Sequence, residues 1–261
     1  MGSTIAIANQ KGGVGKTTTC VNLAAALAMN RRRVLLLDLD PQGNATVGCG
    51  VNKDAASPTG YEVLMDQVSI REAVIPVPDC DFDLVPGNSD LTAAEVALME
   101  GGGRQQNLRR QLARVREEYD YLLIDCPPSL NILTVNALVA AQGVLIPIQC
   151  EYYALEGLTA LLDTIRRVQQ GANRELRVQG LLRTMFDPRN NLANQVGAQL
   201  LQHFPKQVYS TQIPRNVRLA EAPSHGQPAI QYDRYSRGSL AYMALASELI
   251  RKDMQASAAS A

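Results

Sequence analysis

A glycine-rich segment near the N-terminus constrains the fold more than any other feature of this 261-residue chain. It reads QKGGVGKTT over residues 10–18, after an apolar run at 4–8 and at the start of helix-forming sequence at 17–29. Glycines let the backbone approach a bound group closely, and a strand–turn–helix arrangement directs backbone N–H groups and the positive end of a helix dipole at one point. The segment therefore predicts a phosphate-binding loop.

Individual side chains of this loop have separate chemical roles. Lys16 is placed to reach the β- and γ-phosphates of a nucleotide, and the Thr17 hydroxyl to ligate Mg²⁺. The usual pattern has a glycine five residues before Gly15, but Gln10 stands there, and Lys11 follows it. Because Lys16 already serves the bound nucleotide, Lys11 is available to reach a nucleotide in a facing subunit, as an arginine finger does.

Short apolar runs alternate with helical sequence along the chain. Six runs are almost continuously apolar and too short for helices, at 4–8, 34–37, 82–85, 121–124, 144–148 and 178–182. Helices are predicted at 17–29, 104–118, 131–141, 154–170, 192–203 and 238–251, and loops at 49–60 and 101–103. Buried strands that alternate with helices predict an α/β fold with a doubly wound, mostly parallel sheet and helices on both faces.

The length and the last residues suggest how the chain is divided. We expect one domain over residues 1–254. Residues 255–261 are small and polar, and are predicted to form a flexible tail.

Aspartates end two of the apolar runs. Asp38 and Asp40 follow the second run, at the strand end where ligands bind in such sheets. We expect Asp40 to position or activate an attacking water and Asp38 to join the Mg²⁺ shell. Asp125 follows the run at 121–124, as in the Walker-B arrangement that holds Mg²⁺ directly or through water. Either aspartate pattern alone is weak evidence for a metal or catalytic site, and the phosphate loop strengthens that evidence.

Composition and charge exclude several classes of protein. The 25 Lys and Arg residues balance 25 Asp and Glu residues, which argues against a protein that coats DNA by bulk charge. No apolar run is long enough to span a membrane, no signal peptide is recognisable, and the five cysteines contain no CxxC pair, so a cytoplasmic protein is expected. Residues 166–237 nevertheless hold 11 basic and 4 acidic side chains.

Together these motifs resemble those of the ParA/Soj-type partition ATPases, a deviant-Walker branch of the P-loop NTPases that includes MinD. The resemblance covers about residues 3–252. It rests on KGGVGKTT (11–18), DLDPQGNAT (38–46), LLIDCPPS (122–129), PIQCEYYALEGL (147–158) and IPRNVRLAEAPSHG (213–226).

The resemblance implies a role for each matched residue. Lys11 would contact nucleotide across an ATP-bound homodimer, Gly12 would have to stay small for the dimer to close, and Asp40 would be the hydrolysis carboxylate. Catalysis would rest on Lys11, Lys16 and Asp40, and Mg²⁺ on Thr17 and Asp125, with Asp38 beside them as its place at the strand end predicts. ATP would be bound by Lys11, Gly12, Gly13, Val14, Gly15, Lys16, Thr17, Thr18, Thr184, Asp187, Pro214, Arg215 and Asn216.

The resemblance also implies partners. Arg189 and Arg218 match positions that hold double-stranded DNA without sequence preference in Soj-like proteins, and both lie in the basic segment 166–237. A ParB-type centromere-binding protein would stimulate slow ATP hydrolysis, and the cycle would segregate or position chromosomal or plasmid DNA over the nucleoid. Longer plasmid-type relatives carry an N-terminal helix-turn-helix region, which is not expected here because the phosphate loop starts at residue 10.

Three alternatives remain open. A MinD-like membrane-associated division-site ATPase would need a C-terminal amphipathic helix with a basic face, whereas residues 240–254 lead into an Ala/Ser tail, so no membrane binding is expected. An iron–sulfur reductase or scaffold would need a cysteine pair near a dimer face. A nucleotide-gated binder with negligible turnover would act only through a partner.

Overall fold

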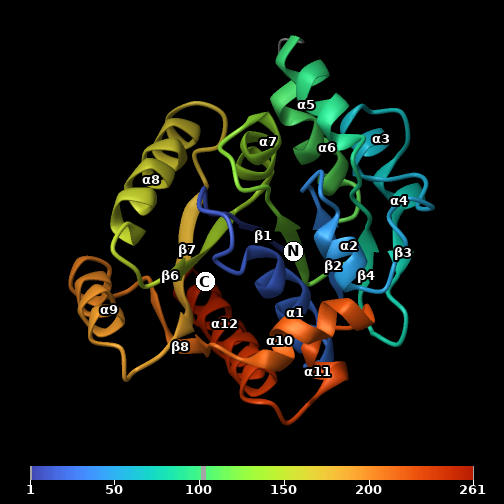
Figure 1. Cartoon of the computed structure of the whole chain (residues 1–261). Coiled ribbons are helices and arrows are strands. Elements are labelled where there is room, and N and C mark those ends of the chain that lie inside the picture. The colour runs from blue at the N-terminus through green and yellow to red at the C-terminus, as the bar shows by residue number, and fades with distance from the viewer. Residues whose placement is uncertain (1, 101–103, 261) are drawn as a thin grey trace.

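One central sheet organises the part of the chain that the computed structural model describes, residues 2–100 and 104–260 (Figure 1). Its strands are β1 (Ser3–Ile7), β2 (Val34–Asp38), β3 (Ile75–Pro76), β4 (Asp83–Val85), β5 (Tyr121–Asp125), β6 (Gly143–Gln149), β7 (Arg177–Phe186) and β8 (Val208–Pro214). The spatial order is β3-β4-β2-β5-β1-β6-β7-β8, and neighbours are parallel except for β3 with β4. The predicted fold class is confirmed.

Helices cover both faces of this sheet. They are α1 (Lys16–Met29), α2 (Asn44–Gly48), α3 (Gly60–Leu64), α4 (Ile70–Ala73), α5 (Leu91–Glu100), α6 (Asn107–Ala113), α7 (Ile132–Ala140), α8 (Ala154–Gln170), α9 (Asn191–His203), α10 (Val217–Glu221), α11 (Ala229–Tyr232) and α12 (Arg237–Ser260). Helices α1 and α10–α12 lie on one side, and α5–α8 on the other (Figure 1). The sheet thus separates two apolar cores.

Side chains along β1 alternate between these two cores. Ile5 and Ile7 belong to the cluster that contains α1 and α12, whereas Ala6 and Ala8 belong to the cluster that contains α7. All four are almost completely buried, as expected for a central parallel strand covered on both faces. Burial of apolar surface at about 25 cal/mol per Å² is the main term that stabilises this arrangement.

The register of the central strands decides where the polar ends fall. Asp125 of β5 lies beside Ile7 of β1 on one side and beside Asp38 of β2 on the other. The carboxyl ends of three parallel strands therefore meet at one edge of the sheet, and the loop after β1 starts there.

All six predicted strands are present, and the structure adds two. The edge strand β8 was not predicted because the polar residues Ser210, Thr211 and Gln212 interrupt its apolar residues, so it forms no apolar run. Strand β3 has only two residues, too few for any pattern. Strand β7 is also longer than the predicted 178–182, since its last residues include the polar pair Arg183 and Thr184.

The predicted helices are also present, with different ends. Residues 104–118 form a 3-10 turn at Arg104–Gln106 and the shorter helix α6. Helix α12 continues to Ser260, so the predicted end at 251 is wrong, because alanine-rich sequence sustains a helix. Flexibility of 255–261 stays a prediction, as does the single domain, and Ala261 and the predicted loop 101–103 lie outside the described residues.

The short helices and the ten-residue helix α5 were not predicted from the sequence. Helices α2, α3, α4, α10 and α11 have four or five residues each, less than two turns, so no helical period can be recognised. The predicted loop 49–60 is confirmed except for its last residue, which begins α3. No helix within the described ranges is both long and apolar enough to cross a bilayer.

Candidate functional site

The glycine-rich loop joins β1 to α1, as predicted. Gly13 and Gly15 have φ angles of 73° and 89°, a left-handed region that side chains with a Cβ atom rarely adopt. Gly15 precedes α1, and no side chain caps this helix. The N–H groups of its first turn are therefore available to a ligand at the positive end of the helix dipole.

Gly12 differs from the other loop glycines. A Cβ atom built on Gly12 would meet nothing within 4 Å, and its φ is not in the left-handed region. Nothing inside the described part of this chain therefore requires glycine at that position. If Gly12 must stay small, the requirement comes from a molecule outside this chain.

Lys16 lies inside the loop. Its side chain is 6% exposed, and its Nζ atom donates a hydrogen bond to the carbonyl oxygen of Lys11 at 3.1 Å. Burial lowers the pKa of Lys16, and the charge of Asp125 acts in the opposite direction. The loop is fixed from the sheet as well, because the Thr184 hydroxyl of β7 donates to the carbonyl oxygen of Val14 at 2.8 Å.

Lys11 points out of the loop instead. Its Nζ atom pairs with Glu151 Oε2 at 2.5 Å, just before α8, and both side chains are close to half exposed. Gln10 fixes the same side of the loop by donating to the carbonyl oxygen of Gly157 at 3.1 Å. The two lysines thus face different surroundings, one enclosed and one at the protein surface.

Asp38 and Asp125 are completely buried side by side at the carboxyl edge of the sheet. Burial raises the pKa of each carboxyl group, and for Asp125 the neighbouring Asp38 charge adds to the effect. Asp38 accepts hydrogen bonds from the N–H and hydroxyl of Thr46, each at 2.8 Å, and from the N–H of Asp40 at 3.2 Å. These bonds shape the loop after β2, and metal binding by Asp38 stays a prediction.

Asp125 is less completely bonded than Asp38. Its Oδ1 atom accepts a weak bond from the Cys20 thiol at 3.3 Å. Its Oδ2 atom is buried and has no hydrogen-bond partner among the described residues. A buried carboxylate oxygen without a partner is costly, so it indicates a place for a cation or an ordered water.

A cavity of about 670 Å³ opens beside these groups. Most of the loop lines it, together with Asp40, Thr184 and residues 214–216 at the end of β8. This volume lies in the usual range for small-molecule sites. Asp40 is only 7% exposed, and its Oδ1 atom accepts from the N–H of Gln42 at 3.0 Å, which orients the carboxylate.

Not every predicted site residue lines the cavity. Its lining includes the predicted residues Gly12, Gly13, Gly15, Lys16, Thr17, Thr18, Asp40, Thr184, Pro214, Arg215 and Asn216. Absent from the lining are Lys11, Val14, Asp38, Asp125 and Asp187. Val14 instead accepts a hydrogen bond through its backbone carbonyl oxygen, and Asp187 pairs with Arg189 at the surface.

Several residues at the site were not singled out by the sequence analysis. Tyr242 of α12 lines the cavity and shares a hydrogen bond of 3.1 Å with Thr19 of α1, across more than 200 residues of sequence. Met185, which lies between the predicted residues Thr184 and Asp187, also lines it with a φ of 48°, which is unusual for a residue with a side chain. Glu151 lay inside a recognised motif, but only the fold places it beside Lys11.

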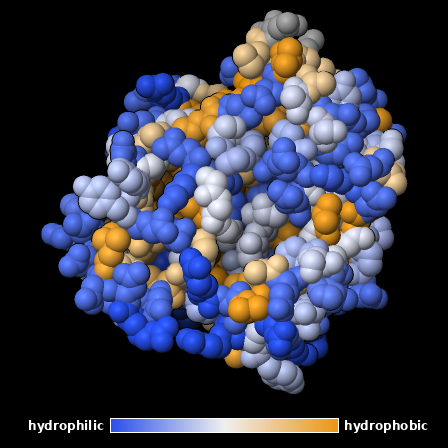
Figure 2. Space-filling model, viewed as in Figure 1, coloured by the Kyte–Doolittle hydropathy of each residue, from blue (hydrophilic) through white to orange (hydrophobic). Residues whose placement is uncertain are grey.

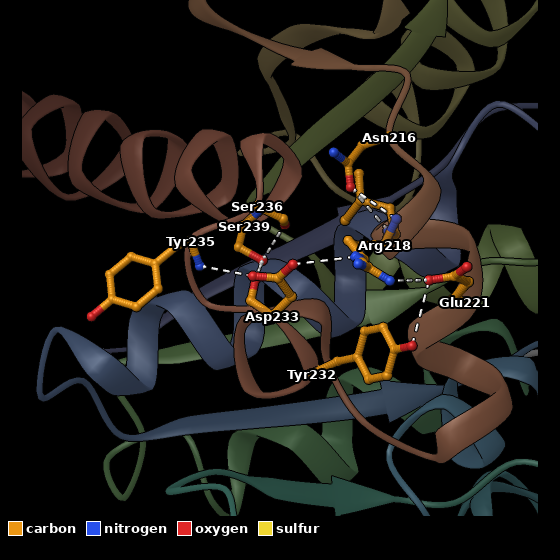
Figure 3. A network of polar contacts seen from close by, with 9 residues as sticks. Asn216, Arg218, Glu221, Tyr232, Asp233, Tyr235, Ser236 and Ser239 are labelled. Carbon is orange, nitrogen blue, oxygen red and sulfur yellow. Dashed lines mark hydrogen bonds and ion pairs between the residues drawn. The ribbon is translucent and has the colours of Figure 1, made fainter.

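The two predicted DNA-binding arginines lie outside the cavity. Arg189 is largely exposed and pairs with Asp187 at 2.9 Å, which lowers the pKa of Asp187 to about 2 through hydrogen bonds. Arg218 of α10 pairs with Glu221 at 2.9 Å and with Asp233 at 3.2 Å (Figure 3). Both arginines therefore already have acidic partners.

No self-sufficient metal centre exists in the described parts of the chain. No group of three or more His, Cys, Asp and Glu side chains there could hold a metal ion. The five cysteines are free, and four of them are buried. Burial raises the pKa of the Cys20 and Cys49 thiols well above the usual value, which makes them poor nucleophiles.

Comparisons with known proteins agree with this geometry. A family described as an AAA domain matches residues 2–178. The chain is 52% identical to the chromosome partitioning protein ParA of Myxococcus xanthus, covering 97% of this chain and 89% of that protein. It is 51% identical to the sporulation initiation inhibitor protein Soj of Bacillus subtilis, covering 95% and 98%.

A solved structure is similar throughout. The cobyrinic acid a,c-diamide synthase of Mycobacterium smegmatis, crystallised with an ATP analogue and magnesium, superposes with a TM-score of 0.84 at 38% identity, over 96% of this chain and 95% of that one. The phosphate loop, the aspartates at the carboxyl edge and the near full-length identity lead to one assignment: the chain belongs to the ParA/Soj family of chromosome-partitioning ATPases.

Proposed function

We propose that this protein is an ATP-dependent switch that dimerises with ATP, binds DNA without sequence preference, and hydrolyses ATP when a ParB-type partner stimulates it. Its cycle segregates or positions chromosomal or plasmid DNA, and the protein works in the cytoplasm on the nucleoid. The observation that carries this proposal is the separation of the two loop lysines, Lys16 enclosed at the cavity and Lys11 held at the surface by Glu151.

The cavity fits ATP with Mg²⁺. The uncapped start of α1 and the enclosed Lys16 suit the phosphates, and residues 214–216 suit the base. Thr17 and the unpartnered oxygen of Asp125 would hold Mg²⁺, with Asp38 shaping the loop beside them. The bound ion would neutralise part of the negative charge of the phosphates.

Asp40 is the carboxylate in position to act on water. It lies in the cavity wall and is oriented by the Gln42 N–H. Its role in hydrolysis is to orient the attacking water by accepting a hydrogen bond from it.

Lys11 explains why the dimer depends on nucleotide. In this chain alone its ammonium group has Glu151 as partner, at a surface where the ion pair contributes little free energy. The phosphates of a nucleotide in a facing subunit carry more charge and would compete for Lys11. The open space above Gly12 leaves room for that subunit.

The experiment measures binding of the purified protein to a fluorescent DNA duplex with ATP, with ADP and without nucleotide, over a salt series. We expect binding only with ATP, for duplexes of any sequence, with affinity that falls steeply as salt rises. Lys16→Ala should abolish binding, and Asp40→Ala should prolong it. Binding to anionic vesicles in place of DNA would favour the MinD-like alternative and overturn the proposal.

A second measurement follows the oligomeric state by light scattering. Lys11→Ala should bind ATP but stay monomeric, since Lys11 does not line its own cavity. Dimerisation of Lys11→Ala at the concentrations that dimerise the unchanged protein would remove Lys11 from its proposed role.

A further inference from the structure

We propose that the DNA-contacting surface is centred on the turn between α11 and α12, where Arg234, Tyr235 and Arg237 contact phosphates, and that Arg218 positions this turn. The inference rests on the proposed function, and it assigns to that function residues that no motif marked. The partner is the phosphate backbone of double-stranded DNA.

Arg218 lies at the surface and is already engaged by other side chains of the protein. Figure 3 shows its guanidinium between the carboxylates of Glu221 and Asp233, at 2.9 and 3.2 Å. The same guanidinium lies over the ring of Tyr232, 5.9 Å from its centre. Its Nη1 and Nε groups thus bind carboxylates from two separate segments, Glu221 of α10 and Asp233 after α11, so its structural role is to hold these elements together.

Asp233 links Arg218 to the turn between α11 and α12. Its carboxylate accepts from the N–H of Tyr235 at 3.2 Å, and its carbonyl oxygen accepts from the Ser239 hydroxyl of α12 at 2.7 Å. Ser236 and Ser239 share a further hydroxyl hydrogen bond at 2.9 Å (Figure 3). The turn that carries the neighbouring arginines is therefore fixed from both sides.

The side chains on this turn are exposed. The Tyr235 side chain is 83% exposed and points away from the network in Figure 3. Arg234 and Arg237 are exposed, and the ion pairs of the described residues do not include them. In Figure 2 the lower part of the molecule, around α10 to α12, is mostly hydrophilic. Arginine forks and tyrosine hydroxyls are groups that commonly contact DNA phosphates.

Two further observations favour a functional role for Arg237. It is the first residue of α12, where the helix dipole disfavours a cation, and no acidic residue occupies that turn. It also lies close enough to Asp187 to help lower the pKa of that carboxyl, after the larger effect of the hydrogen bonds from Arg189. Arg237 is thus a cation on the same side of the molecule as Asp187, placed where the helix itself does not favour one.

The test uses the full chain with ATP and Mg²⁺ and a fluorescent random-sequence duplex, with Arg234→Ala/Arg237→Ala as the main variant. We expect the affinity to fall by about tenfold or more, and the salt slope to shrink by about 0.9 for each phosphate that the variant no longer neutralises. The matched control is Arg174→Ala/Arg177→Ala, which removes two exposed arginines near the opposite end of β7 and should keep both affinity and slope. Melting temperatures check folding of both variants.

Arg218→Lys tests the positioning role. A lysine keeps the charge but cannot bridge two carboxylates as the guanidinium fork does, so we expect it to lose affinity almost as Arg218→Ala does. A phosphate contact at Arg218 would instead be largely rescued by lysine. The inference is overturned if the 234/237 variant binds as the unchanged protein does, or if Arg218→Lys restores full affinity. Absence of ATP-dependent binding by the unchanged protein overturns the proposed function as well.

Discussion

The nucleotide cavity and the surface that carries Arg189 and Arg218 differ in how completely their polar groups are bonded. At the cavity, Lys16 is buried and Asp125 keeps an oxygen without a partner among the described residues. At the surface, Arg189 and Arg218 are exposed and both are paired. Incomplete bonding costs much free energy where water is excluded and little where it is present. At the cavity, a buried polar atom without a partner therefore indicates where a ligand binds. At the surface, the candidate ligand contacts are the arginines that take no part in the ion pairs of the described residues.

Lys16→Ala should produce the largest effect that this comparison predicts. The variant loses charge-assisted hydrogen bonds to phosphate, worth about 3 kcal/mol together, or roughly 100-fold in ATP affinity. Titration calorimetry with ATP and Mg²⁺ measures the loss. Lys206→Ala, which removes an exposed lysine, is the matched control and should bind ATP normally. Equal affinities for the two variants would contradict the assignment.

Thr46→Val should have the next largest effect, on stability. The hydroxyl donates to buried Asp38 and accepts from the Gly87 N–H at 2.9 Å, so its removal leaves the buried Gly87 N–H without a partner and takes one of three hydrogen bonds from Asp38. We expect the free energy of unfolding to fall by about 1–3 kcal/mol in urea denaturation. Thr164→Val removes a hydroxyl whose hydrogen bond lies at the surface within α8, and should change stability much less.

Glu248 allows a test of how bonding of a buried carboxylate affects stability as the pH changes. Burial acts to raise its pKa, but hydrogen bonds from the Ser210 and Thr211 N–H groups outweigh this and lower it below the usual 4.5. Its contribution to stability is thus present above pH 4.5 and is lost as the pH falls through the lowered value. Thermal melts over this range should show a smaller decrease for Glu248→Gln, and parallel curves would contradict the interpretation.

Asp187→Asn should have the smallest effect. It removes the acidic partner of exposed Arg189, so we expect no measurable change in melting temperature and an increase of about threefold in DNA affinity. Anisotropy with labelled duplex measures the change, with Asp163→Asn, a carboxylate paired on α8, as control. A parallel loss of ATP affinity would instead support the predicted role of Asp187 in nucleotide binding.

The sequence predicted local features better than distant contacts. The loop, the strands and the aspartates at 38, 40 and 125 were recognisable because their chemistry depends on adjacent residues and on buried, continuously apolar strands. The pairing of Lys11 with Glu151 and the position of Tyr242 at the cavity depend on packing between segments more than 100 residues apart. No local sequence pattern predicts such contacts.

Arg218 shows a second limit of sequence reasoning. Its position in a motif and its charge predicted a surface role, and it does lie at the surface. Its engagement by Asp233 depends on how α10 packs beside the α11–α12 turn, which the sequence does not reveal.

The long helix α12 has a practical consequence for anyone who wishes to follow this protein in a cell. It runs from the nucleotide edge of the sheet, where Tyr242 lines the cavity, to the opposite edge, where Asp253 is bonded to Gln179 near the start of β7. Its 24 residues span about 36 Å at 1.5 Å per residue. A fluorescent protein fused after α12 would therefore lie far from the ATP cavity and from the facing subunit proposed above, and should report location without blocking the proposed dimer.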